Sequence, residues 1–335
     1  MKISASVYSN ISRPLDELVK ELDGYHVDYF HIDCNDDLSV FEDIRKIRSI
    51  SKTPVDLHII SPHPEKFFDG IRQTGTEMVS FQFENLTGPL DIPAGITSKI
   101  GLAIVSGTPP ESFSRLKNQF DFVLFMTTTP GKSGGKFNRE NFRRIRQFQS
   151  LFPGAKIHVD GGVNDEISFV LRNMGVSLVV SGSYLVNADY MGIALHRLRS
   201  ETGSDHILAG DFMIDKNECP VLETGKFSFR DVLQSIEKYN MGFTTVTGRK
   251  GELEGIITNA DVRRGLLRHT GDLNKIEASA LVNRSPVKVT QGQSVSEIIQ
   301  MIKRLSFPVL FIPVVDDDNI FTGTLTFNNL IKGES

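Results

Sequence analysis

The sequence predicts an α/β fold in which a (β/α)8 barrel is followed by a smaller, internally repeated α/β module. Three observations predict this fold class. Short apolar runs alternate with amphipathic stretches over roughly the first 200 residues. The runs number eight, and eight strands alternating with helices call for a parallel sheet that closes into a barrel. Beyond residue 211 a different, repeated pattern takes over.

The predicted barrel strands are Ile3–Val7, Tyr29–Asp33, Val55–Ile60, Met78–Phe83, Lys99–Val105, Phe122–Thr127, Lys156–Val159 and Leu178–Ser181. Helical patterns lie between them at Pro14–Leu22, Val40–Ile50, Pro64–Gln73, Arg139–Leu151 and Glu166–Met174. Two separate dinucleotide-binding halves are the alternative, but such halves need a glycine fingerprint after the first strand. The run Ile3–Val7 has none after it, so the barrel is preferred.

The second module follows a linker that we place at Glu201–Asp211, where the pattern weakens. Beyond it, two copies of one β-α-β-β-α unit recur at a nearly constant offset. Their paired strands are Thr244–Val246 and Gly255–Thr258 in the first copy, and Val309–Val314 and Gly323–Thr326 in the second. The predicted domains are therefore residues 1–204 and 211–335, and the second divides into about 211–272 and 276–335.

Composition limits the classes of function. The chain has 335 residues, a net charge of −4 and a sequence pI of about 6.1, which argues against a nucleic-acid partner because such proteins carry a basic excess. Two cysteines, Cys34 and Cys219, argue against a disulfide framework and fit a reducing compartment. Neither a signal-type run at Met1–Arg13 nor an apolar span of about 20 residues is present, so we expect a cytoplasmic protein without a membrane partner.

Four side chains at the ends of predicted strands suggest a metal site. His31 and Asp33 face the same way because side chains alternate along a strand, and His58 and Asp160 end the third and seventh strands. Taken singly, His58 is readable as a hydrogen-bonded structural residue and Asp160 as a helix N-cap. Because strand ends converge at one mouth of a barrel, the four together predict a site for divalent Zn, Fe or Mn. His158, on the face of Asp160, is a weaker candidate for a supporting role.

Glycine-rich loops suggest a phosphate site. The loop Thr128–Phe137 would let backbone N–H groups approach an anion closely, and it is no Walker A loop because Met126 stands where that motif needs its first glycine. Its glycines are Gly131, Gly134 and Gly135. The runs Asp160–Gly162 and Ser181–Ser183 follow strands seven and eight, where barrels commonly seat phosphates. Any one of these loops is readable as an ordinary turn, but three on adjacent strands favour phosphate.

The two sets of residues together suggest the chemistry. Inverting a carbon next to a carbonyl needs a base on one face and an acid on the other, and Asp33 and Asp160 could flank a substrate between them. A metal that holds the carbonyl and a neighbouring hydroxyl would stabilise an enediolate intermediate as a Lewis acid. The sequence thus predicts an epimerase.

The first domain resembles the ribulose-phosphate 3-epimerase family. The resemblance rests on Ile3–Ser6, His31–Asp33, Asp56–His58, Gly101–Pro109, the pattern M-x-x-x-PG-x-x-GG from Met126, Val159–Gly162 and Gly182–Ser183. It implies that His31, Asp33, His58 and Asp160 bind the metal and that both aspartates double as acid and base. It also implies substrate contacts, from Ser6 and the retained Met126 and, at the phosphate, from Gly131, Gly134, Gly135, Gly161, Gly162, Gly182 and Ser183.

Several positions depart from that family's pattern. Asn35 and Ile60 stand where the family usually has methionines, Gln82 follows Phe81 where the family has Phe-His, and Thr129 replaces an asparagine. These changes reshape the walls around the sugar, so the identity of the sugar is left open.

The segment Gly255–Arg264 resembles the end of a CBS module, especially those attached to arabinose 5-phosphate isomerases, and the resemblance implies that the repeat is a tandem CBS (Bateman) pair. The resemblance implies that Thr258 and Asp261 hold the ribose of an adenine or cytidine nucleotide. Thr326 matches in the second copy, but Asn329 replaces the aspartate. Asp261 is equally readable as a helix N-cap, and many CBS pairs serve only to dimerise. A homo-oligomer is expected.

The leading hypothesis is a metal-dependent isomerase that interconverts D-ribulose 5-phosphate and D-xylulose 5-phosphate, regulated by a nucleotide at the CBS pair. One alternative keeps the chemistry and changes the sugar, for instance to a ketohexose 6-phosphate or a precursor of surface polysaccharide. Another is a non-catalytic sensor of sugar phosphate and nucleotide. Retention of both carboxylates and all four candidate ligands weighs against the sensor.

Overall fold

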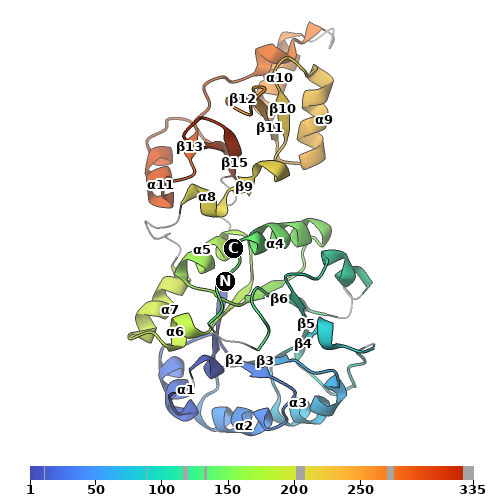
Figure 1. Cartoon of the computed structure of the whole chain (residues 1–335), viewed down its shortest axis with the longest axis vertical. Coiled ribbons are helices and arrows are strands. Elements are labelled where there is room, and N and C mark those ends of the chain that lie inside the picture. The colour runs from blue at the N-terminus through green and yellow to red at the C-terminus, as the bar shows by residue number, and fades with distance from the viewer. Residues whose placement is uncertain are drawn as a thin grey trace. The chain divides into compact units, whose positions relative to one another are not determined.

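A computed structural model gives the fold and describes residues 1–10, 12–88, 90–115, 120–131, 134–200, 208–269 and 275–326. These residues form two compact units, the first ending by residue 200 and the second beginning at residue 208 (Figure 1). The predicted domain boundary at residue 204 lies outside the described residues and stays a prediction.

The first unit is a closed barrel of eight parallel strands in the order β1 to β8, with β8 paired to β1. The strands are β1 (Lys2–Ser6), β2 (Tyr29–Cys34), β3 (Val55–Ile59), β4 (Met78–Gln82), β5 (Lys99–Val105), β6 (Phe122–Met126), β7 (Ile157–Asp160) and β8 (Leu178–Ser181). The predicted barrel is confirmed, and each predicted strand is present with its ends shifted by no more than one residue.

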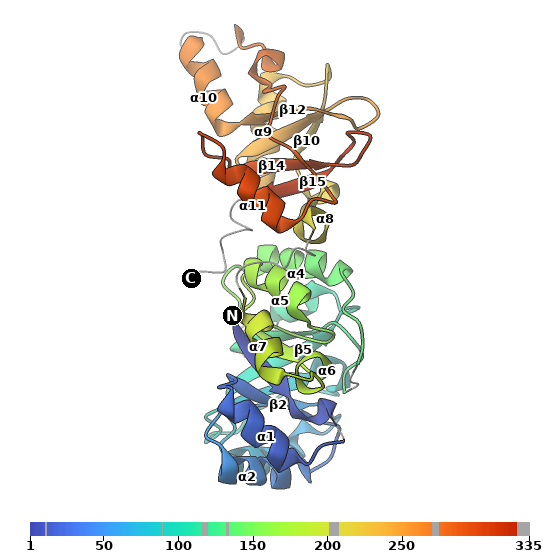
Figure 2. The ribbon, with the colours of Figure 1, turned by 90° about the vertical axis from the view of Figure 1, so that its left-hand side faces the viewer.

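Helices and short 3-10 turns cover the outside of the barrel. They are η1 (Val7–Ser9), α1 (Leu15–Gly24), α2 (Val40–Ile50), η2 (Pro64–Phe67), α3 (Phe68–Thr74), η3 (Phe83–Asn85), η4 (Pro110–Arg115), α4 (Glu140–Leu151), α5 (Asp165–Asn173), α6 (Ser183–Val186) and α7 (Met191–Arg199). Helix α5 packs against α7 on the outer wall (Figure 2). In their described parts, the connections that follow β4 and β5 contain 3-10 turns and no α-helix.

The inside of the barrel has an apolar and a polar side. Its apolar cluster consists of Tyr29, Met78, Ala103, Phe122, Leu124, Met126, Leu178 and Val180. Because side chains alternate along a strand, residues two or four positions from Tyr29 and Met78 also point inward, and on β2 and β4 these residues are polar. They include His31 and Gln82, both of which are buried. Polar side chains inside a barrel need partners, and these partners form the site described below.

The second unit contains two similar repeats. Its elements are α8 (Ala209–Phe212), β9 (Ile214–Asp215), η5 (Lys216–Glu218), β10 (Val221–Glu223), α9 (Phe229–Tyr239), β11 (Phe243–Thr247), β12 (Leu253–Thr258), α10 (Asn259–Arg268), η7 (Ala278–Leu281), β13 (Val289–Thr290), α11 (Val295–Lys303), β14 (Phe311–Val315) and β15 (Phe321–Thr326). One sheet has the order β10-β11-β12 and the other β13-β14-β15-β9.

The repeats match in detail. Each antiparallel pair, β11–β12 and β14–β15, carries a register shift near its end, at Val246/Thr247 and at Val314/Val315. The rings of Phe243 and Phe311, which begin β11 and β14, stack with centroids 4.4 Å apart. The predicted repeat is therefore present, although the last helix of the second copy, expected near Asn329, lies outside the described residues.

Two details differ from the prediction. Strand β9 was not predicted, and it crosses from the start of the unit to pair with β15 of the second repeat. The end of the predicted linker is also structured, because Leu208 forms a bridge with Ser294 and α8 follows directly. Cys34 and Cys219 are both buried free thiols. Among the described residues, no helix combines the length and apolar character that crossing a bilayer requires.

Candidate active site

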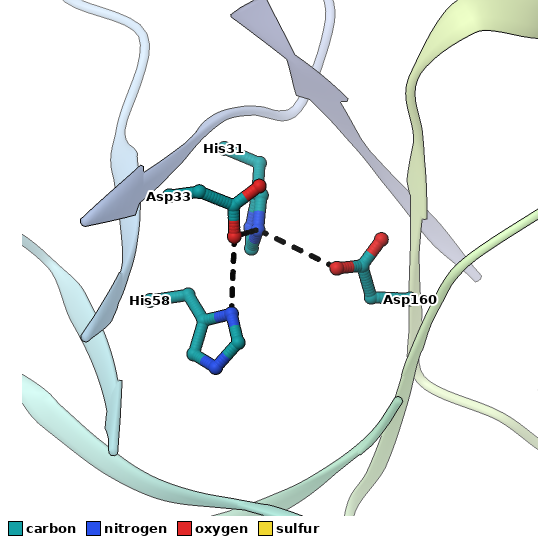
Figure 3. A group of neighbouring side chains, drawn as sticks. All are labelled: His31, Asp33, His58 and Asp160. Carbon is teal, nitrogen blue, oxygen red and sulfur yellow. Dashed lines mark hydrogen bonds and ion pairs between the residues drawn. The ribbon is translucent and has the colours of Figure 1, made fainter. Parts of the chain in front are cut away.

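The carboxyl-terminal ends of β2, β3 and β7 bring four side chains together at one mouth of the barrel (Figure 3). One ligand atom from each of His31, Asp33, His58 and Asp160 lies within 4.8 Å of the others. Nε2 of His31 is 3.4 Å from an oxygen of Asp33 and 3.7 Å from an oxygen of Asp160. Nδ1 of His58 is 3.1 Å from the same oxygen of Asp33. The structure thus brings all four predicted ligands into one cluster.

Strand register explains why these residues meet. His31 and Asp33 lie two positions apart on β2 and therefore share its inner face. Asp33 is directly opposite His58 in the parallel pairing of β2 with β3. Asp160 ends β7, which is separated from β2 by β8 and β1, so its carboxylate approaches from another side of the mouth.

A buried carboxylate orients His31. One oxygen of Asp56 lies 2.9 Å from Nδ1 of His31 and accepts a hydrogen bond from the Ser4 hydroxyl at 3.1 Å. Because a carboxylate accepts, Nδ1 of the neutral imidazole carries the proton and the lone pair of Nε2 faces the cluster. Among the described residues, Nε2 has no hydrogen-bond partner although it is buried. Sequence reasoning assigned no role to Asp56, whose only sequence signal is its position two residues before His58.

These residues fit a divalent cation. The side chain of His31 has no exposed surface, and a buried ring nitrogen without a hydrogen-bond partner requires an explanation. Two imidazole nitrogens and two carboxylates are a donor set that suits Zn, Fe or Mn. The hydrogen bond from His31 to Asp56 is the outer contact that metal-ligating histidines commonly make.

The two carboxylates differ in proton affinity. Burial would raise the pKa of Asp33, but His31 and His58 lower it well below its usual range. Burial and the nearby charge of Asp33 raise the pKa of Asp160 to about 6. Burial would lower the pKa of His31, but the carboxylates of Asp56 and Asp33 raise it. A pair of carboxylates whose pKa values are driven apart is an arrangement used for acid and base catalysis.

A cavity of about 440 Å³ opens on this cluster and is lined by both carboxylates. It is also lined by every residue predicted to contact substrate: Ser6, Met126, Gly131, Gly134, Gly135, Gly161, Gly162, Gly182 and Ser183. Further lining residues were not predicted to contact substrate: Tyr8, Lys136, Arg139, Glu166 and Tyr184. They lie on the segments that follow β1, β6, β7 and β8, so only their position after strand ends could have indicated them.

Close backbone contacts explain two of the glycines. Gly162 has φ +66°, and a Cβ built there would lie 2.3 Å from the backbone nitrogen of Phe137. Gly161 has φ +115°, and its Cβ would lie 2.4 Å from the hydroxyl of Thr128. The loops after β6 and β7 therefore pack so closely that a side chain at either position would force them apart.

Three alternative interpretations of single residues are corrected. Asp160 is no helix N-cap, because α5 is capped by Asn164, whose side chain accepts from the backbone N–H of Ile167 at 2.9 Å. His158 packs on Phe122 with ring centroids 4.2 Å apart, and burial lowers its pKa to about 4, so it is a neutral core residue.

The third correction concerns Asp261. Thr258 is the N-cap of α10, and Asp261 is the third helical residue, completing a capping box. One oxygen of Asp261 accepts from the backbone N–H of Thr258 at 2.8 Å and from its hydroxyl at 2.6 Å, and the other pairs with Arg264. Thr326 is opposite Phe311 in the second repeat, as Thr258 is opposite Phe243 in the first.

Fold and site together define a (β/α)8-barrel protein with a cluster of ligand-type side chains at the mouth where such barrels perform chemistry. A sequence model of the ribulose-phosphate 3 epimerase family matches residues 2–186, and the chain belongs to this family. Membership confirms the predicted enzyme class, an isomerase of the epimerase type. A model of the CBS domain matches residues 278–334, which confirms a CBS module in the second repeat.

Known relatives are similar at modest identity. The ribulose-phosphate 3-epimerase of Mycobacterium tuberculosis (strain H37Rv) is 25% identical over 190 residues, covering 53% of this chain and 83% of the relative. That of Helicobacter pylori (strain J99) is 27% identical over 216 residues, covering 60% and 97%. Among solved structures, the CBS-pair protein CBSX2 from Arabidopsis thaliana matches with a TM-score of 0.32 and 20% identity, covering 37% of this chain and 92% of that one.

Proposed function

We propose that the chain is a metal-dependent sugar-phosphate epimerase that interconverts D-ribulose 5-phosphate and D-xylulose 5-phosphate by moving a proton at C3. The observation that carries this proposal is the pair of carboxylates, Asp33 and Asp160, that lines one cavity with oppositely shifted pKa values. The ribulose-phosphate 3-epimerases among the relatives support the choice of substrate.

Four side chains would hold the cation: His31 through Nε2, His58 through Nδ1, and Asp33 and Asp160 through carboxylate oxygens. When bound, a divalent cation supplies Lewis-acid stabilisation of negative charge on substrate oxygens. Asp56 keeps the proton of His31 away from this site, because it accepts from Nδ1.

The two carboxylates would transfer the protons. One of them, ionised, removes the proton from C3 on its side of the substrate, and the other, protonated, donates a proton to C3 from the opposite side. The bond from C3 to one hydrogen breaks and a new one forms on the other face, so the configuration inverts. Each turnover leaves the two carboxylates with exchanged protonation states, ready for the reverse epimer. In the protein without a cation, Asp160 binds a proton more readily than Asp33, because its pKa is raised and that of Asp33 is lowered.

Glycine-rich segments would seat the phosphate. Gly161 and Gly162 after β7, Gly182 and Ser183 after β8, and the loop at Gly134 line the same cavity as the carboxylates. Backbone close to the cavity wall, with no Cβ in the way, is how proteins bring N–H groups to a phosphate.

One experiment tests the reaction. Metal-loaded protein is incubated with D-ribulose 5-phosphate in deuterated water, and deuterium at C3 together with new D-xylulose 5-phosphate is followed by NMR. We expect both. A panel of ketose phosphates, including a ketohexose 6-phosphate, is run in parallel. Faster exchange with another member would move the proposal to that sugar, and no exchange with any member would contradict an enzyme and favour the sensor.

The alternative of a different sugar has one specific observation in its favour. Asn35 lines the cavity beside the carboxylates, and its amide can donate to and accept from a substrate hydroxyl. The likeness of Gly255–Arg264 to the CBS modules of arabinose 5-phosphate isomerases is the motive for placing such a sugar in polysaccharide synthesis.

For the CBS pair we propose binding of an adenine or cytidine nucleotide near Thr258 and Asp261, and association of two or more chains. Because a ligand that binds only the folded state raises its stability, a nucleotide should raise the melting temperature. The wild-type protein is compared with Thr258→Val. An unchanged melting temperature with both adenine and cytidine nucleotides would contradict nucleotide binding. Light scattering tests the association of chains, and the mass of a monomer would contradict it.

A further inference from the structure

A side chain in the barrel wall is placed to decide which nitrogen of His58 faces the candidate metal site. We propose that Gln82, held in one orientation by Glu84, is a positioning residue that keeps the His58 proton on Nε2 and directs the Nδ1 lone pair toward the cation. This inference rests on the metal site of the proposed function and not on the identity of the sugar.

Gln82 makes hydrogen bonds through both ends of its amide. It ends β4 and is 1% exposed. Its carbonyl oxygen lies 2.9 Å from Nε2 of His58. Its NH2 group donates to a carboxylate oxygen of Glu84 and, at 3.4 Å, to the backbone carbonyl of Ala103. The side chain of Gln82 therefore links a proposed metal ligand to a carboxylate outside the ligand cluster.

The partners of Gln82 prevent its amide from turning over. An ionised carboxylate and a backbone carbonyl can only accept hydrogen bonds. A rotated amide would place the buried Gln82 oxygen against two acceptors, the Glu84 carboxylate and the backbone carbonyl of Ala103, and it would leave the buried carbonyl without a donor, which is costly. Glu84 is itself fixed, because its other oxygen accepts from the backbone N–H of Val105 at 3.0 Å and from the hydroxyl of Thr108.

The fixed amide determines the tautomer of His58. A neutral imidazole carries one N–H, for which the Gln82 oxygen at Nε2 and the Asp33 oxygen at Nδ1 compete, and the fixed amide is the acceptor that allows Nε2 to be the donor. Nδ1 then presents its lone pair to Asp33, whose oxygen is 3.1 Å away. Two acceptors at this distance repel each other, and a cation that both coordinate removes the conflict. Without Gln82, the carboxylate of Asp33 would attract the proton to Nδ1 and block that ligand.

The two imidazoles are thus oriented by different chemistry. His31 donates to the buried carboxylate of Asp56, whereas His58 donates to the neutral amide of Gln82. The hold on His58 depends on the second link, from Gln82 to Glu84, because an amide has a donor end as well as an acceptor end. Glu84, which reaches His58 only through Gln82, therefore also helps to orient the His58 ring.

The test compares Gln82→Met with Ser80→Ala as the matched control. Ser80 lies on the same strand, is fully buried, and its hydroxyl has no hydrogen-bond partner among the described residues, so its loss should change little. In the metal-free proteins, long-range proton–nitrogen NMR identifies the protonated ring nitrogen of His58. Zinc affinity is measured by competition with a chromophoric chelator. We expect Nε2–H in the wild type and in Ser80→Ala, but Nδ1–H and zinc binding about 10- to 100-fold weaker in Gln82→Met.

Two further variants follow the link through Glu84. Glu84→Ala removes no contact to a proposed ligand, yet it frees the amide, and we expect roughly 2- to 10-fold weaker zinc binding, the equivalent of one hydrogen bond. The double variant Gln82→Glu, Glu84→Gln reverses the hydrogen bond between the two residues and keeps an oxygen acceptor toward Nε2 of His58. It should therefore restore the wild-type tautomer of His58 and most of the zinc affinity.

Wild-type zinc affinity together with Nε2–H in Gln82→Met would overturn the inference. So would a wild-type protein that carries the His58 proton on Nδ1. If circular dichroism shows that Gln82→Met does not fold, Glu84→Ala decides, and an unchanged tautomer and affinity in that variant would also overturn it. Zinc binding without epimerisation would instead contradict the proposed reaction and leave the role of Gln82 standing.

Discussion

Replacing Asp56 by asparagine tests whether the orientation of His31 determines metal binding. Asp56 is 2% exposed, and a single oxygen accepts from Nδ1 of His31 at 2.9 Å and from Ser4 at 3.1 Å. Asparagine has nearly the same size but no charge. If its amide nitrogen faced His31, the imidazole proton would move to Nε2, where the proposed ligand lone pair must be.

The expected loss follows from these contacts. A hydrogen bond to a charged group contributes about 1.5–3 kcal/mol, against about 0.5–1.5 kcal/mol for a neutral pair. The difference of about 1–1.5 kcal/mol corresponds to zinc binding that is roughly 5- to 13-fold weaker, since about 1.4 kcal/mol is a factor of ten. Loss of the fixed tautomer adds to this. We therefore expect Asp56→Asn to bind zinc about 10- to 100-fold more weakly than the wild type.

Competition with a chelator measures this affinity, and circular dichroism confirms that the variant is folded. Ser4→Ala is the matched control, because it removes one hydrogen bond from Asp56 and leaves the carboxylate facing His31. It should lose much less affinity. Equal zinc affinity of Asp56→Asn and the wild type would refute the reasoning, and an equal loss in both variants would show that general damage to the barrel is responsible.

Three further outcomes are expected. Because a cation competes with the protons on Asp160, whose pKa is raised to about 6, and on His31, whose pKa is raised above its ordinary value, zinc affinity should fall as the pH drops toward and below about 6. A flat profile would contradict this, and Asp160→Asn should remove the part of the fall that lies near pH 6. Gly162→Ala should lower the free energy of unfolding by about 1–3 kcal/mol and raise KM, because Gly162 has φ +66° and a Cβ there would lie 2.3 Å from the nitrogen of Phe137. Denaturation and rate measurements check this, and wild-type values would mean that the two loops can move apart. Chelation should lower the melting temperature and zinc should restore it, because zinc at a thousandfold excess over Kd raises the free energy of unfolding by about 4 kcal/mol. An unchanged melting temperature would argue against a bound cation.

Strand ends made the barrel and its cluster predictable. Apolar runs of four to seven residues between amphipathic helices mark buried parallel strands, and their carboxyl ends must meet at one mouth. The sequence was therefore enough to predict one cluster of four side chains, since the prediction needed only the alternation along each strand and the position of its end. These side chains are His31, Asp33, His58 and Asp160. The wall residues Tyr8 and Arg139 gave no such signal, because loop paths are not periodic.

Contacts between strands could not be predicted in the same way. Asp56 reaches His31 because the two are opposite in the register of β2 with β3, and Gln82 reaches His58 from β4. The alternation of side chains along a strand places such residues on the inner face, but it does not give the register between neighbouring strands. Strand β9 escaped prediction for another reason: with two residues it is too short to show periodicity, and only its pairing to β15 defines it.

In the second unit, the repeat was visible but the roles of its polar residues were not. A Thr and an Asp three residues apart at a strand end serve equally well for a capping box and for a ribose contact. The structure shows that Thr258 and Asp261 form the box, with Arg264 on the remaining oxygen. Their hydrogen-bonding groups are thus already engaged, and nucleotide binding there would have to share or displace these contacts.

The central claim is that two carboxylates on opposite sides of C3 carry out the inversion. The most direct test compares Asp33→Asn and Asp160→Asn with the wild type by following deuterium at C3 of both epimers, with metal content measured in each sample. Loss of one acid–base group commonly costs about 100- to 10,000-fold, so we predict that each variant loses epimerisation by at least about a hundredfold. Deuterium should still enter one epimer, from the side of the carboxylate that remains, wherever the metal is retained. Wild-type epimerisation in metal-loaded Asp160→Asn or Asp33→Asn would contradict the two-carboxylate account.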